Sequence, residues 1–233
     1  MIRAALALLL LAAPALADDA ALRVQIARDP SVAAAAPALA RFMEAEDDAL
    51  VQEMQAAAET ERADAAKGGL PFRPHSLDIA AQARGVSRAL MSVLRTVSSD
   101  TGGAHGNVYL DPLTWDRRGG KLIRLDAILS EDKAGFRALE AIAKRLRADL
   151  MARPDLWRDS IAMATVPDPA ALQGFTLEPS TTPGRIGGLA FHFGPYEVGP
   201  YSSGPQRAVI AQSLFRSGIR ADLRDQFDGA PKD

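Results

Sequence analysis

Three histidines are the first candidates for acid–base or metal chemistry in this chain: His75, His105 and His192. A metal site carried by one helix uses two histidines three to five residues apart, and no pair here has that spacing. The chain also has no cysteine, which excludes thiolate ligands, thiol nucleophiles and disulfides. We therefore expect neither a metal nor another cofactor.

The sequence contains no complete nucleophile elbow, phosphate-binding loop or dinucleotide-binding loop. Ser87 lies in Gly-Val-Ser-Arg-Ala, where an alanine replaces the second glycine of a nucleophile elbow. Lys121 follows a glycine but precedes leucine, so a phosphate-binding loop lacks its hydroxyl. The glycines at 102, 103 and 106 do not have the order of a dinucleotide loop. With 29 acidic residues, carboxylate pairs for glycoside hydrolysis exist by number alone, and none stands out.

Two irregular loops hold the remaining candidates. Residues 101–107 combine three glycines with the only asparagine of the chain, and all four tolerate positive φ angles. Residues 194–205 are rich in glycine and proline and contain two tyrosines. Each loop is either a tight structural connection or a binding surface. The candidate binding residues are Thr101, Gly102, Gly103, His105, Asn107, Tyr196, Glu197 and Tyr201.

The elements around these loops follow from hydrophobic periodicity. Helical spacing predicts helices at residues 37–67 and 136–150. Gly68 and Gly69 end the first of these helices, and its acidic side is expected to face solvent. Period-two patterns predict strands, including a pair that turns at Arg84-Gly85. The strands are expected at 22–26, 77–83, 86–97, 108–115, 122–125, 175–177, 189–193 and 208–210, and short helices at 126–129, 157–161 and 214–227.

This order predicts an α+β fold with antiparallel sheets and packed helices. We expect two interlocked halves, residues 18–130 and 131–233. The 233 residues can bury a sizeable core. A net charge of −2 excludes the broad basic field of a nonspecific nucleic-acid-binding protein.

The N-terminus predicts export. Arg3 precedes an apolar run at residues 4–11, and Ala15-Leu16-Ala17 has the pattern of a cleavage site. The run is shorter than the roughly 18 apolar residues that span a bilayer, and no later run reaches that length. We therefore expect a signal peptide at residues 1–17, cleavage after Ala17, a periplasmic or secreted protein, and no transmembrane segment after cleavage.

Both loops carry a family resemblance. Residues 101–107, with the segment 120–129, resemble the extracytoplasmic PdaC-type domain. Residues 189–205, with Phe191, Phe193, Tyr196 and Tyr201 in their pattern, resemble the adjoining RsiV-type domain. Both were defined as domains of unknown function. In RsiV anti-sigma factors such a domain binds lysozyme, and in the PdaC deacetylase it precedes the catalytic module.

The resemblance implies a binding role without catalysis, because this chain has no room for the deacetylase module. The first hypothesis is a periplasmic or secreted protein that binds a protein, such as lysozyme, or a cell-wall component. The alternative is an envelope hydrolase that uses His105 with nearby carboxylates. Whether the two loops converge on one exposed patch would separate architecture from function.

Overall fold

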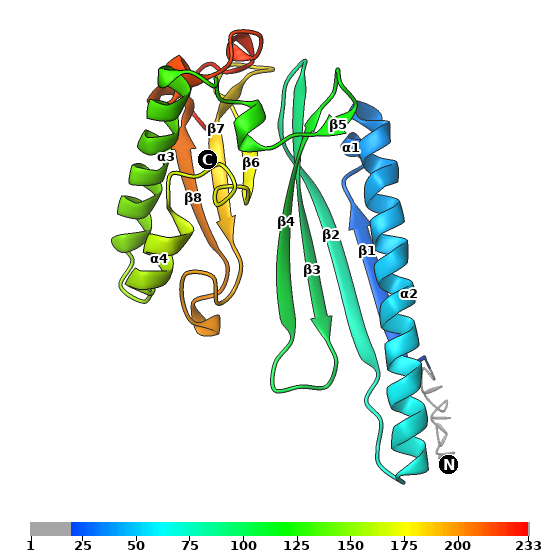
Figure 1. Ribbon diagram of the computed structural model, residues 1–233. Coiled ribbons are helices and arrows are strands. Elements are labelled where there is room, and N and C mark those ends of the chain that lie inside the picture. Colours follow the sequence, from blue (N-terminus) through cyan, green and yellow to red (C-terminus); the bar gives the residue numbers. More distant parts are fainter. Residues whose placement is uncertain (1–19, 233) are drawn as a thin grey trace, which may run out of the picture.

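The computed structural model describes residues 20–232, so the predicted signal peptide lies outside the described residues. A five-stranded sheet and a three-stranded sheet stand beside each other, each with helices on its outer side (Figure 1). The large sheet has the order β1-β2-β3-β4-β5, and only β1 and β2 pair in parallel. Its strands are β1 (Leu22–Arg28), β2 (His75–Val86), β3 (Leu90–Asp100), β4 (Asn107–Asp116) and β5 (Lys121–Leu122). The predicted α+β class is confirmed.

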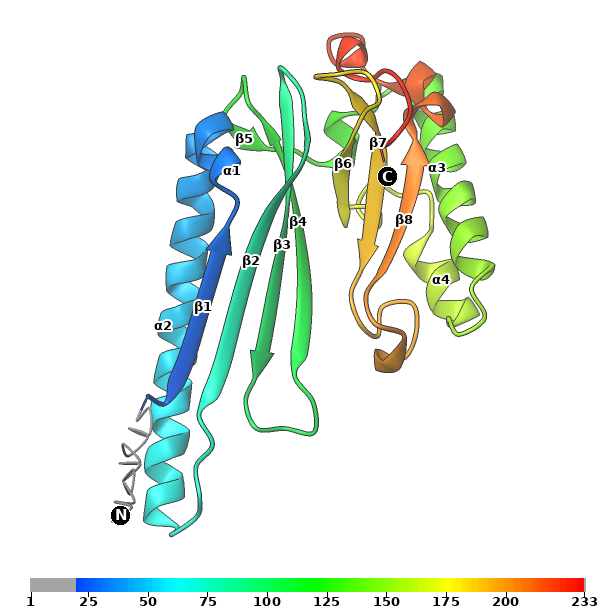
Figure 2. The same cartoon turned by 180° about the vertical axis from the view of Figure 1, so that it is seen from behind.

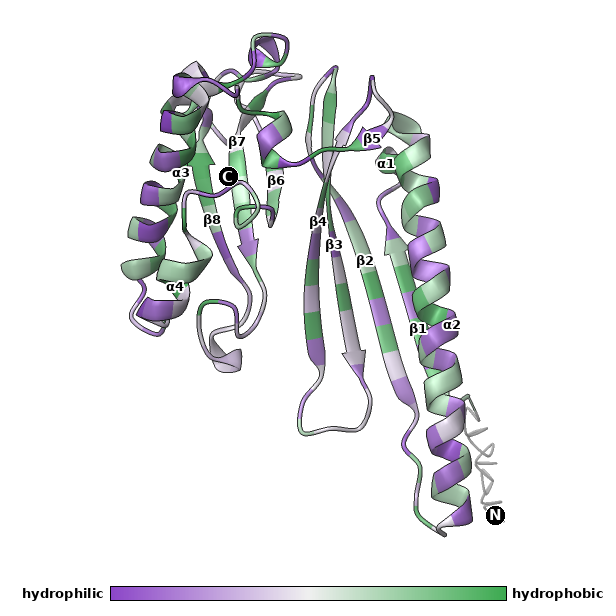
Figure 3. Cartoon of the chain, viewed as in Figure 1, coloured by the Kyte–Doolittle hydropathy of each residue, from purple (hydrophilic) through white to green (hydrophobic). Residues whose placement is uncertain are grey.

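Two helices cover the outer face of the large sheet. Helix α1 (Pro30–Ala35) starts at Asp29, whose side chain accepts a hydrogen bond from the Ser31 amide. The long helix α2 (Pro37–Lys67) has the predicted bounds. Polar and apolar residues alternate along it (Figure 3), and its buried Leu39 and Met43 pack with apolar residues of β2, β3 and β4.

One carboxylate of α2 departs from the expected solvent-facing acidic side. Asp47 is fully buried. Its Oδ1 accepts a hydrogen bond from Arg95 Nε at 2.7 Å, and its Oδ2 accepts one from Arg28 Nη2 at 2.5 Å. A buried carboxylate needs such partners because desolvation is costly. The ion pairs therefore tie α2 to β3 and to the end of β1.

The small sheet has the order β6-β7-β8 and is antiparallel throughout. Helices α3 (Lys133–Met151) and α4 (Arg158–Ala164) lie on its outer side (Figure 2). Its strands are β6 (Phe175–Pro179), β7 (Ile186–Phe193) and β8 (Gln206–Ala211). Every residue of β7 is buried, because α3 packs on one face and the large sheet faces the other.

The two sheets share a core at the β2–β3 turn. Ala89 and Leu90 belong to the same buried cluster as the apolar residues of α3 and the small sheet. The Leu177 amide donates a 2.9 Å hydrogen bond to Ser92 Oγ on β3. Added at Gly85, a Cβ atom would lie 2.7 Å from the Leu177 backbone. The prediction of a turn at Arg84-Gly85 was therefore wrong: β2 continues to Val86, and the glycine permits close approach of β6.

Three further sequence predictions need correction. Instead of a helix over 214–227, there are three separate 3₁₀ turns: η3 (Gln212–Leu214), η4 (Arg216–Gly218) and η5 (Arg224–Gln226). The strand expected at 122–125 is only the short β5, and the short helix expected at 126–129 is the 3₁₀ turn η1 (Leu125–Ala127). Phe136 lies on α3 but is 57% exposed and outside the core. Within residues 20–232, no helix has the length and apolar content that crossing a membrane requires.

Candidate functional site

The two loops singled out from the sequence meet in the structure. The hydroxyl of Tyr201 donates a 2.7 Å hydrogen bond to the carbonyl oxygen of Gly106. The hydroxyl of Tyr196 lies 3.2 Å from His105 Nε2. The first loop joins β3 to β4 and the second joins β7 to β8, so each sheet contributes one loop. These contacts link the two sheets away from their shared core.

Three rings form an aromatic patch at this meeting point: His105, Tyr196 and Tyr201. His105 stacks on Tyr201, with ring centroids 4.1 Å apart and planes at 24°. Tyr196 is tilted against both, at 6.2 Å from His105 and 5.7 Å from Tyr201. Tyr196 is 54% exposed, His105 is exposed and Tyr201 is half-buried. The aromatic patch is thus a solvent-facing surface and not a buried connection.

Backbone geometry sets the positions of these rings. Tyr196 has φ of 70°, and it is the one non-glycine residue with positive φ among residues 20–232. That region is unfavourable for a bulky L-residue, and such outliers gather at functional sites. In the other loop, Gly102 takes φ of 84°, and its amide donates to Asp100 Oδ1 at 2.8 Å. The strained Tyr196 is therefore held where its ring faces both His105 and solvent.

The other predicted site residues lie in or beside the same two loops, but they make no hydrogen bond between the loops. Thr101, Gly102 and Gly103 are exposed in the first loop, and Asn107 pairs with Ser99 at the start of β4. Glu197 is exposed next to Tyr196. Within the described residues, the hydrogen bonds between the loops run through His105, Gly106, Tyr196 and Tyr201 alone.

Two hydrogen bonds hold the ring of His105 in place. Its Nδ1 lies 2.9 Å from the Gly106 carbonyl oxygen, which fits a proton on Nδ1. Its Nε2 then accepts from the Tyr196 hydroxyl. Both ring nitrogens therefore contact neutral groups, and neither contacts a carboxylate. Across residues 20–232, no group of three or more histidine, aspartate or glutamate side chains could hold a metal ion.

A group of buried polar side chains lies on β6 and β7 of the small sheet: Thr176, Glu178 and His192. His192 Nε2 and Thr176 Oγ1 are 2.9 Å apart, and Arg207 pairs with buried Glu178. Burial lowers the pKa of His192 to about 4, and Arg84 and Arg207 add to this shift. Burial also raises the pKa of Glu178, although Arg207 and Arg84 oppose the change.

This buried group was not predicted from the sequence. Among residues 20–232, Arg84 Nε and Glu178 Oε1 are buried without a hydrogen-bond partner. The polar residues Thr176, Glu178 and His192 interrupt strands that are otherwise apolar, and that pattern was the available signal. Arg84 gave none, because it lies on a different strand, β2.

Comparisons with known proteins show a match to one family model and to solved structures of the same fold. Residues 127–213 match a family model described as "Protein of unknown function (DUF3298)". This range contains α3, α4, the small sheet and the second loop, but not residues 101–107. The comparison with curated proteins found no match.

Two solved structures share the fold. A DUF3298 family member from Bacteroides fragilis NCTC 9343 aligns with a TM-score of 0.56 at 17% identity, covering 84% of this chain and 78% of its own. A DUF3298 family protein from Pseudomonas aeruginosa PAO1 aligns with a TM-score of 0.51 at 19% identity, covering 91% and 88%. Both alignments extend well beyond the segment that matches the family model, so the fold similarity includes the large sheet.

Proposed function

We propose that this protein is an exported, non-catalytic binding protein of the bacterial cell envelope, and that its ligand contacts the aromatic patch. The ligand is a protein such as lysozyme or a component of the cell wall, as the resemblance to RsiV-type and PdaC-type domains implies. One observation carries the proposal: His105 and Tyr196, 91 residues apart in sequence, meet as exposed rings on loops from different sheets.

Ring chemistry supports a binding role. Tyrosine supplies a large contact area with a polar tip and few rotatable bonds, so ordering it on binding costs little entropy. Tyr201 already holds the Gly106 carbonyl, and this bond orders the patch before a ligand arrives. The alternative of an envelope hydrolase that uses His105 with nearby carboxylates gains no support from the geometry, because no carboxylate among residues 20–232 contacts a ring nitrogen of His105.

Retention assays test the ligand. The purified protein is passed over immobilised hen egg-white lysozyme and, separately, mixed with insoluble peptidoglycan. We expect retention on one of them, and we expect Tyr196→Ala and His105→Ala to weaken it about tenfold or more, as for truncation of an interface anchor. Tyr109→Ala is the matched control, because Tyr109 is 62% exposed but outside the patch.

Two results would overturn the assignment. No retention of the unaltered protein on either material removes both named ligands. Equal weakening by Tyr109→Ala and Tyr196→Ala removes the aromatic patch as the binding surface. Export is tested separately by expressing the full chain in a Gram-negative host and determining its mature N-terminus, which is expected at Asp18.

A further inference from the structure

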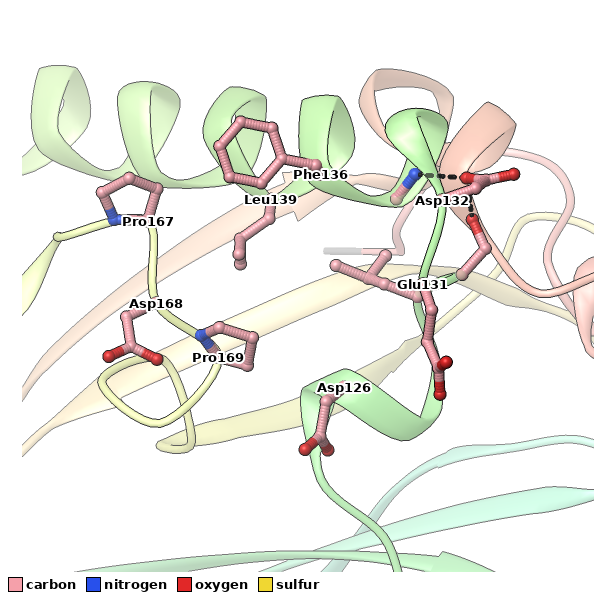
Figure 4. A pocket seen from close by; sticks show the side chains of 11 residues that line it. Asp126, Glu131, Asp132, Phe136, Leu139, Pro167, Asp168 and Pro169 are labelled. Carbon is pink, nitrogen blue, oxygen red and sulfur yellow. Dashed lines mark hydrogen bonds between the residues drawn. The ribbon is translucent and has the colours of Figure 1, made fainter.

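A pocket separate from the aromatic patch lies at the start of α3. It has a volume of about 520 Å³ and is bounded by α3, the turn η1 and the loop after α4 (Figure 4). We call it the α3 pocket. Its size lies within the range of about 300–1,000 Å³ that is usual for ligand pockets. None of its lining residues belongs to the aromatic patch.

The walls of the α3 pocket are apolar. Leu129 and Leu139 form buried parts of the lining, and Pro167 and Pro169 stand across from α3 (Figure 4). Phe136 projects from α3 at the same place with 57% of its surface exposed. Covering an exposed phenylalanine beside an apolar hollow is favourable, because its apolar surface is removed from water. The pocket therefore favours an occupant with an apolar portion.

Its polar lining carries negative charge. Four carboxylates line the pocket, and none of the lining residues is basic. Two of these carboxylates have a structural role. Asp132 Oδ1 accepts hydrogen bonds from the Ala134 and Gly135 amides at the start of α3, and Asp168 Oδ1 accepts one from the Ala170 amide.

The other two carboxylates have no such role. Asp126 and Glu131 are exposed, and neither side chain has a hydrogen bond or ion pair within the described part of the chain. Figure 4 shows them on one side of the pocket, with Asp168 on the other. The fold does not require their charge, which is therefore available to a partner. Apolar walls with two unpaired carboxylates complement an occupant that is both apolar and cationic.

We propose that the α3 pocket docks a segment of a partner polypeptide in which an arginine or lysine adjoins an apolar side chain. The apolar side chain packs against Phe136 and the prolines, and the cation meets Asp126 and Glu131. Neutral glycans lack the cation, and a bare metal ion would make no use of the apolar walls. This docking site is independent of the ligand proposed for the aromatic patch.

A titration followed by NMR tests the proposal. The ¹⁵N-labelled protein is titrated with the blocked tetrapeptide Arg-Leu-Arg-Leu, and with Gln-Leu-Gln-Leu and Glu-Leu-Glu-Leu as matched probes. We expect the arginine peptide to shift the amide signals of η1 and the first turns of α3. The glutamine peptide should bind more weakly and the glutamate peptide should not bind. Added salt should weaken binding of the arginine peptide, because the carboxylates are exposed.

Variants identify the groups responsible. The double change Asp126→Asn with Glu131→Gln should raise the Kd of the arginine peptide about three- to tenfold, as expected for two exposed ion pairs. Phe136→Ser should raise it about tenfold through lost apolar contact. Glu140→Gln is the control, since Glu140 is exposed on α3 but does not line this pocket. Unchanged spectra elsewhere confirm that each variant is folded.

Three outcomes would overturn the proposal: no shifts with the arginine peptide, shifts confined to other surfaces, or equal affinity for the arginine and glutamine peptides. An unchanged affinity in the double variant would remove the two carboxylates from the site. Because the probe is a short peptide and the readout is local, failure here does not affect the retention assays on the aromatic patch.

Discussion

The hydroxyl of Tyr201 donates a hydrogen bond to the carbonyl oxygen of Gly106, although 95 residues separate them in the sequence. The bond joins the loop after β3 to the loop after β7, so the aromatic patch depends on both sheets. Tyr201 thereby has an architectural role, whereas the more exposed Tyr196 and His105 remain available to a ligand.

Removing only that hydroxyl should destabilise the protein modestly. We expect Tyr201→Phe to lower the free energy of unfolding by about 0.5–1.5 kcal/mol, because one hydrogen bond is lost and the ring stays. Urea denaturation measures the change, with Tyr109→Phe as the control. Equal stability of the two variants would show that the bond between the loops contributes nothing.

Acid should destabilise the fold through His192. Its pKa is about 4 in the folded protein, below its ordinary value of 6.5, so the unfolded chain takes up the proton first. The contribution of His192 to stability is therefore complete above pH 6.5 and is lost as the pH falls towards 4. The full loss is roughly 3 kcal/mol.

The pH dependence of stability that is due to His192 must be distinguished from the part that is due to Glu178. Burial raises the pKa of Glu178, so this carboxyl favours the folded state at lower pH and acts in the opposite direction. We therefore compare unfolding between pH 7 and pH 4 in the unaltered protein and in His192→Gln, which can keep a bond to Thr176. The variant should lose less stability over this range. The same loss in both proteins would contradict the assignment to His192.

A side chain at Gly85 should separate the two sheets. The added Cβ of Gly85→Ala would lie 2.7 Å from the Leu177 backbone, which cannot move without disturbing β6. We expect a loss of about 1–3 kcal/mol in thermal or urea unfolding, as for overpacking of a core. Gly103→Ala is the control, because its nearest non-neighbouring atom is 3.9 Å away. Similar stability of both variants would show that the sheets adjust without cost.

Asp47 should matter more than its neighbour Asp48. Asp47→Ala would leave buried Arg95 with only Asp111, 3.3 Å from its Nη1, as an ion-pair partner, and would remove the ion-pair partner of Arg28. The expected loss is about 3 kcal/mol, at the lower end for breaking a buried ion pair from one side, because Asp111 still partly compensates the charge of Arg95. Asp48→Ala changes an exposed carboxylate on the same helix and should cost less than about 1 kcal/mol. Comparable losses would contradict the anchoring role of Asp47.

Local patterns in the sequence determined much of the fold. Helical periodicity and the flanking Pro37 and Gly68 placed α2 at its observed bounds, because capping and amphipathicity act over a few residues. The glycine and tyrosine content of two loops also selected the residues that make the aromatic patch.

Only the tertiary structure decided how these pieces meet. Gly85 reads as a turn residue, yet its place in β2 is set by the approach of Leu177. Asp47 reads as a solvent-facing acid, yet Arg28 and Arg95 arrive from other elements to bury it. Phe136 fits the apolar stripe of α3, yet the fold leaves it exposed beside the α3 pocket. The outcomes at Gly85 and Asp47 depend on partners distant in sequence, and the exposure of Phe136 depends on which elements pack around α3. Periodicity along one segment carries no information about either.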